Sequence, residues 1–249
     1  MTRPHSLKSR ILGAARMLVT RSPLGGTRRG RSETMSGEAL IEAKSHRIRG
    51  VYMHIHKCAG TSLIDAFETV PEVICCVARP GNFDRRTGRE RIPENIWSRS
   101  VKFTFVRHPY DRIHSAYTMF AKSPKWRSLF PEFRDLVEFL SWCDVRRHHV
   151  ATETDTATFV QSIGNVIHHC SAYDNPKYRI AEMDLVGRVE SLDRDYLAVA
   201  ERLGCELPPV PRLRVGGASG SRRNRLSAWE RDAIFDIYRA DFEAFGYDR

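Results

Sequence analysis

An apolar run that leads into a turn of small residues constrains this chain more than any other stretch; it reads V-Y-M-H-I-H-K-C-A-G-T-S-L and occupies Val51–Leu63. The run is typical of a buried strand, and the apolar residues that follow recur at the spacing of one helix face, at Leu63, Ala66, Phe67 and Val70. A strand, a tight turn and a helix are therefore predicted to meet at residues 57–62. Free backbone N–H groups and the positive end of the helix dipole favour an anion at such a junction.

The side chains of this turn suit a phosphate group. Lys57 supplies a positive charge, Gly60 lets the backbone come close to an anion, and the hydroxyls of Thr61 and Ser62 can donate to phosphate oxygens. The lysine precedes the glycine, however, whereas the usual ATP-binding loop reads G-x-x-x-x-G-K-[ST]. Taken alone, the segment is compatible with an anion site and equally with a plain strand-to-helix turn.

A second motif, V-K-F-T-F-V-R-H-P-Y-D-R-I-H-S-A-Y at Val101–Tyr117, repeats the strand-to-helix pattern, with a helix predicted to begin near Pro109. Arg107 follows the strand, and Ser115 lies eight residues further on, two turns into the helix. Both side chains could therefore reach one phosphate at the end of the sheet, with Arg112 as an alternative ligand. The other interpretation is that Arg107 caps the strand and Ser115 is a small packing residue.

Together the two motifs resemble the cofactor motifs of the carbohydrate sulfotransferases, the membrane-type family that modifies glycans. In that family a motif of the form H-I-P-K-x-x-G-T-S binds the 5′-phosphosulfate of 3′-phosphoadenosine 5′-phosphosulfate (PAPS), and F-x-R-x-P-x-x-R-x-x-S-A-Y binds the 3′-phosphate. Two later segments, Met183–Tyr196 and Ile234–Tyr247, are similar to the family's D-x-V-G-R-x-E-x-L block and to its terminal helix. The resemblance extends from about Gly50 to the C-terminus, and His56 stands where proline is usual.

The resemblance implies that PAPS is the co-substrate and that no metal is needed. It assigns the 5′-phosphosulfate to Lys57, Gly60, Thr61 and Ser62, and the 3′-phosphate to Arg107 and Ser115. It also implies that Lys57 stabilises the charge that grows on the departing phosphate. A basic loop at residues 216–225 precedes the last helix, where relatives close a loop over the nucleotide. The expected phosphate or adenine contacts there are Ser221, Arg222 and Arg223, unless this is a solvated surface loop.

The catalytic base is less clearly defined. Several related enzymes place a histidine or a carboxylate between the two cofactor motifs, but residues 63–100 contain no histidine and offer only Glu68, Glu72, Asp84, Glu90 and Glu94. Histidine pairs follow the second motif, at His148-His149 and at His168-His169. The second pair precedes the D-x-V-G-R-x-E block by a spacing similar to that of a His-containing family segment. His169, and after it His168, is therefore the preferred base, with a structural histidine as the alternative and His54 expected to be a core residue.

Strands that alternate with helices predict an α/β fold with a P-loop-like, mostly parallel sheet and helices on both faces, as in the sulfotransferase fold. A further strand is expected at Val73–Ala78, and the apolar spacing predicts helices around residues 136–143 and 192–203. The S-A-W-E sequence at Ser227–Glu230 is a capping box that starts the terminal helix. Arg188 and Glu190 follow the pattern of a strand end and are explained by an ion pair or by cofactor contact.

The first 45 residues are expected to form a basic, disordered tail, followed by a single catalytic domain at residues 46–249. Residues 1–32 contain eight Lys or Arg and no acidic residue. Leu7–Val19 could form a short basic helix that touches an anionic membrane, but it is too short and too charged to span one. A chain with no transmembrane segment and six cysteines without C-x-x-C spacing favours a reduced, cytoplasmic and bacterial protein.

The net charge of +10 suits anionic partners. PAPS is one, and a carbohydrate acceptor that carries acidic groups is the other. The acceptor is expected to be a glycan, glycolipid or glycoside hydroxyl, while a peptide tyrosine or a lipid alcohol stays open. Two alternatives from other classes are a P-loop kinase-like phosphotransferase that uses ATP and a basic nucleic-acid-binding protein. No zinc-finger, RRM-type or helix-turn-helix signature favours nucleic acid.

Overall fold

The computed structural model describes residues 45–77, 86–87, 92–122, 134–146, 173, 178–211 and 223–249, all within the compact unit Met35–Arg249. Its strands are β1 (Gly50–His54), β2 (Val73–Val77), β3 (Arg86–Thr87), β4 (Val101–Val106) and β5 (Leu185–Arg188). Its α-helices are α3 (Gly60–Phe67), α4 (Glu94–Arg99), α5 (Pro109–Lys122), α7 (Leu136–Arg146), α9 (Leu192–Leu203) and α11 (Ala228–Phe245). Short 3-10 helices are η1 (Ser45–Arg47), η4 (Ile180–Glu182) and η5 (Val189–Ser191).

The strands form one five-stranded sheet in the order β3-β2-β1-β4-β5, and each neighbouring pair is parallel. The central strand β1 is buried on both faces, because Val51, Tyr52 and Met53 are all completely buried. This explains why its sequence is a continuous apolar run rather than an alternating one. The predicted α/β fold with a parallel sheet is confirmed.

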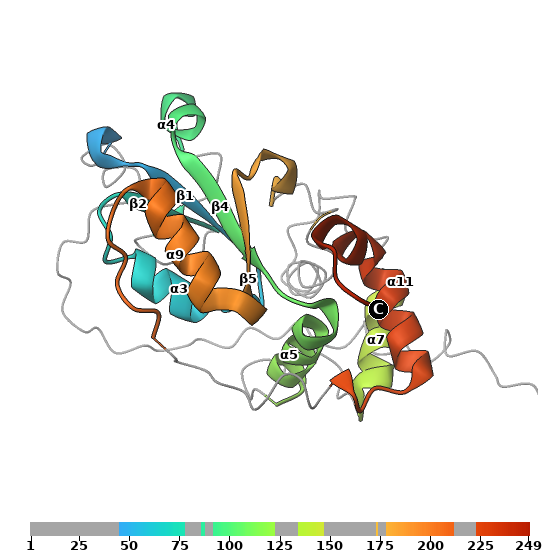
Figure 1. The fold of residues 1–249 in the computed structure, drawn as a ribbon. Coiled ribbons are helices and arrows are strands. Elements are labelled where there is room, and N and C mark those ends of the chain that lie inside the picture. Colours follow the sequence, from blue (N-terminus) through green and yellow to red (C-terminus); the bar gives the residue numbers. More distant parts are fainter. Residues whose placement is uncertain are drawn as a thin grey trace, which may run out of the picture. The chain divides into compact units, whose positions relative to one another are not determined.

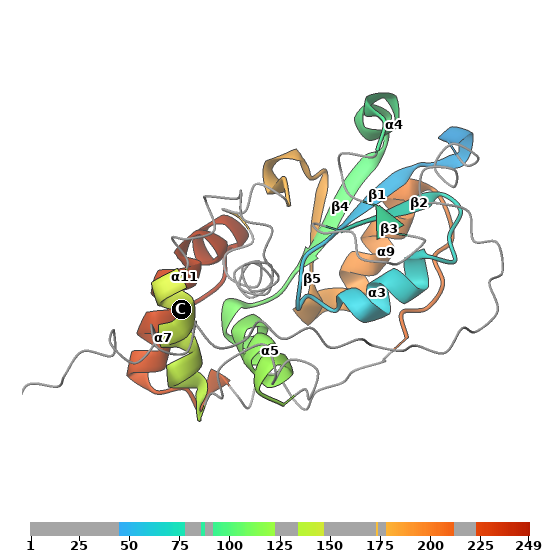
Figure 2. The same cartoon turned by 180° about the vertical axis from the view of Figure 1, so that it is seen from behind.

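Helices cover the two faces of the sheet. On one face, α3 and α9 pack over Tyr52, Phe103 and Phe105, so that Figure 1 shows α9 crossing in front of the strands. On the other face, Val51 and Met53 pack against α4 and residues 178–180, and Figure 2 shows this side with α9 behind the sheet. Because the strands are parallel, the carboxyl ends of β1 and β4 meet at the same edge.

Three helices form a separate group beside the sheet, which both views show. The helices α5, α7 and α11 share a core that includes Ile113, Phe139 and Phe242. The helix α11 begins with the predicted capping box, in which Ser227 and Glu230 each accept from the other's backbone N–H. This group therefore fixes α5, the helix of the second motif, against the C-terminal part of the chain.

One strand and one α-helix were not predicted from the sequence, and both lie in the segment 79–100. The strand β3 has only two residues, and α4 has six. Neither is long enough to show a periodicity, although Ile96 and Trp97 of α4 are buried against the sheet. The predicted strand at Val73–Ala78 is present as Val73–Val77, and Ala78 lies outside the described residues.

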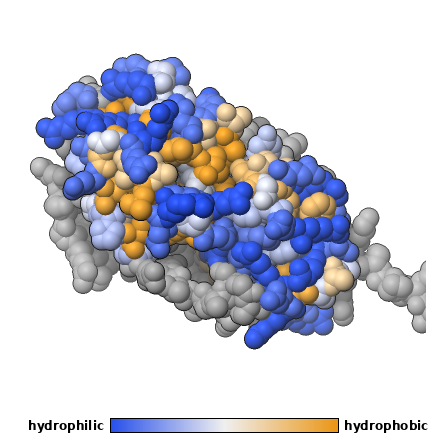
Figure 3. All heavy atoms as spheres, in the orientation of Figure 1, coloured by the Kyte–Doolittle hydropathy of each residue, from blue (hydrophilic) through white to orange (hydrophobic). Residues whose placement is uncertain are grey.

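The surface is mostly polar. Figure 3 shows apolar residues gathered mainly on the half of this face that carries the sheet and α9, while polar residues predominate over α7 and α11. Exposed large hydrophobic side chains include Leu197 on α9 and Trp229 on α11. None of the helices in the described ranges is both long and apolar enough to cross a lipid bilayer.

Candidate active site

The turn between β1 and α3 has an unusual backbone. Lys57 has a φ of 67° and Ala59 a φ of 56°, whereas Cys58 between them and Gly60 after them stay outside the positive-φ region. When successive residues alternate between left-handed and right-handed backbone conformations, their N–H groups point toward a common centre. Such a concavity is suited to an anion. Non-glycine residues adopt this conformation at a cost, and such strain gathers at ligand sites. The turn, residues 55–60, is called the phosphate loop below, after the ligand that the sequence predicts for it.

Glycine is required at position 60 because the His54 ring lies directly against it. A Cβ atom at this position would lie 1.9 Å from the Nε2 of His54, far inside van der Waals contact. The His54 ring therefore packs directly against the first residue of α3, and no larger residue fits there. Thr61 is exposed and Ser62 is half-buried in the same first turn, so both hydroxyls lie at the positive end of the helix.

The two motifs meet through α5. The Nζ of Lys57 lies 3.5 Å from the Sδ of Met119, and Ser115 lies one turn before Met119 on the same face of the helix. Arg107 directly follows β4, which pairs with β1, so its backbone lies at the same carboxyl edge as the phosphate loop. The structure thus brings the predicted residues Lys57, Arg107 and Ser115 to one end of the sheet.

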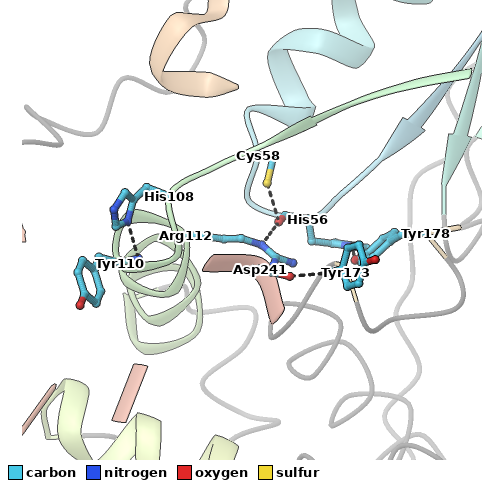
Figure 4. A network of polar contacts seen from close by, with 8 residues as sticks. All are labelled: His56, Cys58, His108, Tyr110, Arg112, Tyr173, Tyr178 and Asp241. Carbon is cyan, nitrogen blue, oxygen red and sulfur yellow. Dashed lines mark hydrogen bonds and ion pairs between the residues drawn. The ribbon is translucent and has the colours of Figure 1, made fainter. Parts of the chain in front are cut away.

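Arg112 does not occupy the position of a phosphate ligand. Its side chain is only 1% exposed, and its guanidinium binds the carbonyl of His56 at 3.1 Å and the carboxylate of Asp241 at 3.0 Å. Figure 4 shows it reaching from α5 beneath the phosphate loop toward α11. The geometry therefore argues against Arg112 as a ligand of the phosphate.

The end of the predicted nucleotide loop is attached to the second motif. The Nε of Arg223 lies 2.7 Å from Asp111 in the first turn of α5, and a terminal nitrogen lies 3.5 Å from Glu190. Asp111 is buried, so this ion pair compensates a charge that would be costly alone. Ser221 and Arg222, two of the expected contacts in this loop, lie outside the described residues.

Arg188 and Glu190 both bind the segment that follows α11. The guanidinium of Arg188 donates to the carbonyl of Phe245 and lies 4.9 Å from the centre of the Tyr247 ring. Glu190 accepts from the backbone N–H of His108 at 2.8 Å and from the hydroxyl of Tyr247 at 3.1 Å. These contacts give both residues a structural role at the end of β5.

The preferred bases cannot be placed, since His168 and His169 lie outside the described residues, as do His148, His149, Asp84 and Glu90. Of the remaining carboxylates, Glu72 lies at the opposite edge of the sheet, where its carbonyl accepts from the N–H of Gly50. Glu68 follows the last residue of α3, about 12 Å along the helix from Gly60. Glu94 begins α4, which precedes the amino end of β4. None of these three lies beside the phosphate loop.

Burial governs the chemistry of the cysteine in the loop. It raises the pKa of Cys58 to about 11, so the thiol stays protonated at neutral pH and is a poor nucleophile. Its Sγ donates to the carbonyl of His56 at 3.6 Å. In the part of the chain that the structure describes, no three His, Cys, Asp or Glu side chains are grouped as metal ligands would be.

Several residues around the loop were not singled out from the sequence. Met119 could have been found, because it shares a helix face with Ser115. Asp241 and Tyr178 could not, because they lie 129 and 122 residues from their partners Arg112 and His56 and no local pattern marks them.

One comparison with known proteins gave a match. The family model described as "Sulfotransferase family" matches residues 43–248, a range that begins before β1 and ends after α11. No curated protein and no solved structure matched the chain. The matched range includes both strand-to-helix motifs, the segment of β5 and the terminal helix, which are the elements that build the edge of the sheet around Lys57 and Arg107. The chain therefore belongs to the sulfotransferase family.

Proposed function

We propose that this protein transfers a sulfuryl group from PAPS to a hydroxyl of a carbohydrate acceptor, and that residues 46–249 are its catalytic domain. The observation that carries the proposal is the meeting of two strand-to-helix turns at one edge of a parallel sheet, in a chain of the sulfotransferase family. Ligands of α/β proteins bind outside the carboxyl ends of the strands. A nucleotide with phosphates at both its 5′ and 3′ ends can place one phosphate at each turn.

The phosphate loop fits a phosphosulfate by its shape. The alternating backbone at residues 57–60 turns main-chain N–H groups toward a common point, and Thr61 and Ser62 add hydroxyl donors. Arg107 and Ser115 hold the 3′-phosphate in this proposal, while Ser221, Arg222 and Arg223 bind phosphate or adenine. Arg223 does so by exchanging Glu190, its more exposed partner at 3.5 Å, for the nucleotide.

PAPS supplies the activated sulfuryl group. Lys57 directs its ammonium at the oxygen that bridges sulfur and phosphorus, and stabilises the negative charge that develops there. Loss of one such donor typically costs about 2.7–4 kcal/mol of transition-state stabilisation. His169, with His168 as the second choice, accepts the proton of the acceptor hydroxyl. No residue of this proposal requires a metal ion.

A ligand titration followed by a transfer assay tests the proposal. The desulfated nucleotide 3′-phosphoadenosine 5′-phosphate (PAP) should raise the melting temperature, because a ligand at 100 times its Kd stabilises the folded state by about 2.7 kcal/mol. ATP with magnesium and a DNA oligonucleotide should not. Transfer of radiolabelled sulfate from PAPS to a panel of neutral and acidic saccharides then identifies the acceptor.

A matched charge control keeps the assay specific. Lys57→Ala should slow transfer about 10²–10³-fold, whereas Arg202→Ala, which removes an exposed positive charge from the end of α9, should leave it unchanged. If ATP stabilises the protein and PAP does not, the proposed sulfuryl transfer is overturned and an ATP-dependent phosphotransferase is favoured instead. Transfer to a tyrosine peptide or a lipid alcohol, and to none of the saccharides, would keep the reaction and overturn the carbohydrate acceptor.

A further inference from the structure

A buried guanidinium lies directly beneath the phosphate loop. Arg112 donates from its Nε to the backbone carbonyl of His56 at 3.1 Å and from a terminal nitrogen to Asp241 at 3.0 Å. The second carboxylate oxygen of Asp241 accepts from the backbone N–H of Tyr173 at 2.7 Å. Figure 4 shows these groups lying in one row from α5 across to residue 173. The loop, α5 and α11 are thereby joined through one side chain.

The same loop residue is held a second time through its ring. The Nδ1 of His56 lies 2.9 Å from the hydroxyl oxygen of Tyr178. Burial raises the pKa of Tyr178, so its hydroxyl stays neutral and forms an ordinary hydrogen bond. His56 is therefore fixed at its carbonyl by one element and at its ring by another. Arg112, Asp241 and Tyr178 are called the His56 clamp below.

The position of His56 explains why a clamp is needed. The next residue, Lys57, has a φ of 67°, a conformation that non-glycine residues adopt only when their surroundings impose it. The related motif has proline at this position, whose ring fixes φ by itself. Histidine has no such restriction, so contacts from outside the loop must supply the rigidity.

We infer that Arg112 is a positioning residue that holds the phosphate loop in its strained shape through the His56 carbonyl, with Asp241 as its anchor. It does not touch the bound nucleotide; it acts through the backbone that carries Lys57. Its effect on catalysis rests on the proposed function of the loop, whereas its effect on the shape of the loop does not.

The variants must separate positioning from general stability. Removing Arg112 alone would leave Asp241 buried without its partner, which is strongly destabilising, whereas replacing both partners of a buried ion pair by apolar residues is often neutral. The test protein is therefore Arg112→Met combined with Asp241→Leu. The matched control is Lys102→Met combined with Asp184→Leu, which removes an ion pair of 3.0 Å at the amino end of β4, away from the loop.

Hydrogen exchange of the full chain without ligand gives the first readout. The backbone amides of residues 57–60 should exchange about tenfold faster in the Arg112/Asp241 variant, while those of 103–106 in β4 keep their wild-type rates. The control should leave both segments unchanged. Unaltered exchange in the loop would overturn the inference, and so would equal acceleration in β4, because that marks Arg112 as general support of the core.

A second variant covers failure of the first to fold. Arg112→Lys keeps a positive charge opposite Asp241 but loses the planar fork that reaches both acceptors, so loop exchange should again rise selectively. For catalysis, Arg112→Lys should lower kcat about tenfold in the wild-type background and less than about threefold in Lys57→Ala, because both changes act on one group. Equal losses in the two backgrounds would overturn the inference. If wild-type protein transfers no sulfate, the proposed function fails, and the exchange experiment still decides the role of Arg112.

Discussion

The ammonium of Lys57 rests 3.5 Å from the sulfur of Met119. A thioether is a weaker hydrogen-bond acceptor than a phosphate or sulfate oxygen. The contact spans the gap between the phosphate loop and α5, which belong to different motifs of the sequence. In the proposed site, Met119 therefore lies between the residues assigned to the two ends of the nucleotide.

Lys57→Ala is expected to reduce kcat far more than it weakens product binding. Loss of one charge-stabilising donor typically lowers kcat about 10²–10³-fold. The affinity for PAP should fall less, because the backbone of the loop and the hydroxyls remain. Single-turnover rates and calorimetric titration with PAP measure the two effects, and near-normal turnover would remove Lys57 from the mechanism.

Gly60→Ala is expected to destabilise the protein by about 1–3 kcal/mol, the usual cost of overpacking. The added Cβ would lie 1.9 Å from the His54 ring, so one of the two must move. Urea unfolding gives the free energy of unfolding. Adding His54→Ala removes the obstructing ring and should recover at least part of the loss; if the two losses simply add, the His54 contact is not the cause.

Arg107→Ala and Ser115→Ala are expected to weaken PAP binding without changing the binding of adenosine 5′-phosphate, which has no 3′-phosphate. Hydrogen bonds to charged groups contribute about 1.5–3 kcal/mol, equivalent to about 10–100-fold in affinity. Calorimetry with both nucleotides yields the ratio of the two affinities. A ratio that stays at the wild-type value would favour the interpretation in which Arg107 caps the strand and Ser115 packs.

Stability is expected to fall as the pH falls below neutrality because of His108. Its Nε2 lies 3.1 Å from the carbonyl of Asp248 and its Nδ1 accepts from the N–H of Tyr110 at 3.3 Å, so the neutral ring is satisfied and has no place for a second proton. Burial lowers the pKa of His108 below its usual 6.5, and the charge of Arg223 lowers it further. The unfolded chain thus binds a proton at His108 near pH 6.5, whereas the folded chain binds it only at a lower pH. The free energy of unfolding therefore decreases as the pH falls from about 6.5 to the lowered pKa of the folded state.

Urea unfolding at about pH 7.5 and about pH 5.5 measures this loss, since histidine titrates between these values. His108→Gln should reduce the difference between the two free energies. Asp184 and Asp195, whose pKa values are lowered from 3.8, influence stability only in more acidic solution. An unchanged difference in the variant would assign the effect to another group.

Tyr52→Phe is expected to stabilise the protein by about 1 kcal/mol, the lower end of the cost of a buried unpaired polar group. The Tyr52 side chain is completely buried beside Phe67 and Phe103, and its hydroxyl has no hydrogen-bond partner among the residues described. Urea unfolding measures the change. Tyr178→Phe serves as the contrast, because it removes a hydroxyl that binds His56 and should destabilise.

The local elements could be predicted from the sequence because their signals are local. The apolar run of β1, the helix face that begins at Leu63 and the capping box at Ser227 each lie within a few residues. The role of Arg112 could not, because helical position alone does not distinguish a side chain directed to a ligand from one directed to Asp241, 129 residues away. The backbone conformation of Lys57 could not be predicted either, because no sequence pattern indicates a positive φ at a lysine.

The pairing of β1 with β4 sets the distance between the two turns at the end of the sheet. Neighbouring strands lie about 4.8 Å apart, and Met53 of β1 is opposite Thr104 of β4, close to the carboxyl edge where both turns begin. The separation of the two turns is thereby set by backbone hydrogen bonds rather than by side chains. Under the proposed function, substitutions in the surrounding loops can then change which acceptor is admitted while the nucleotide keeps its place.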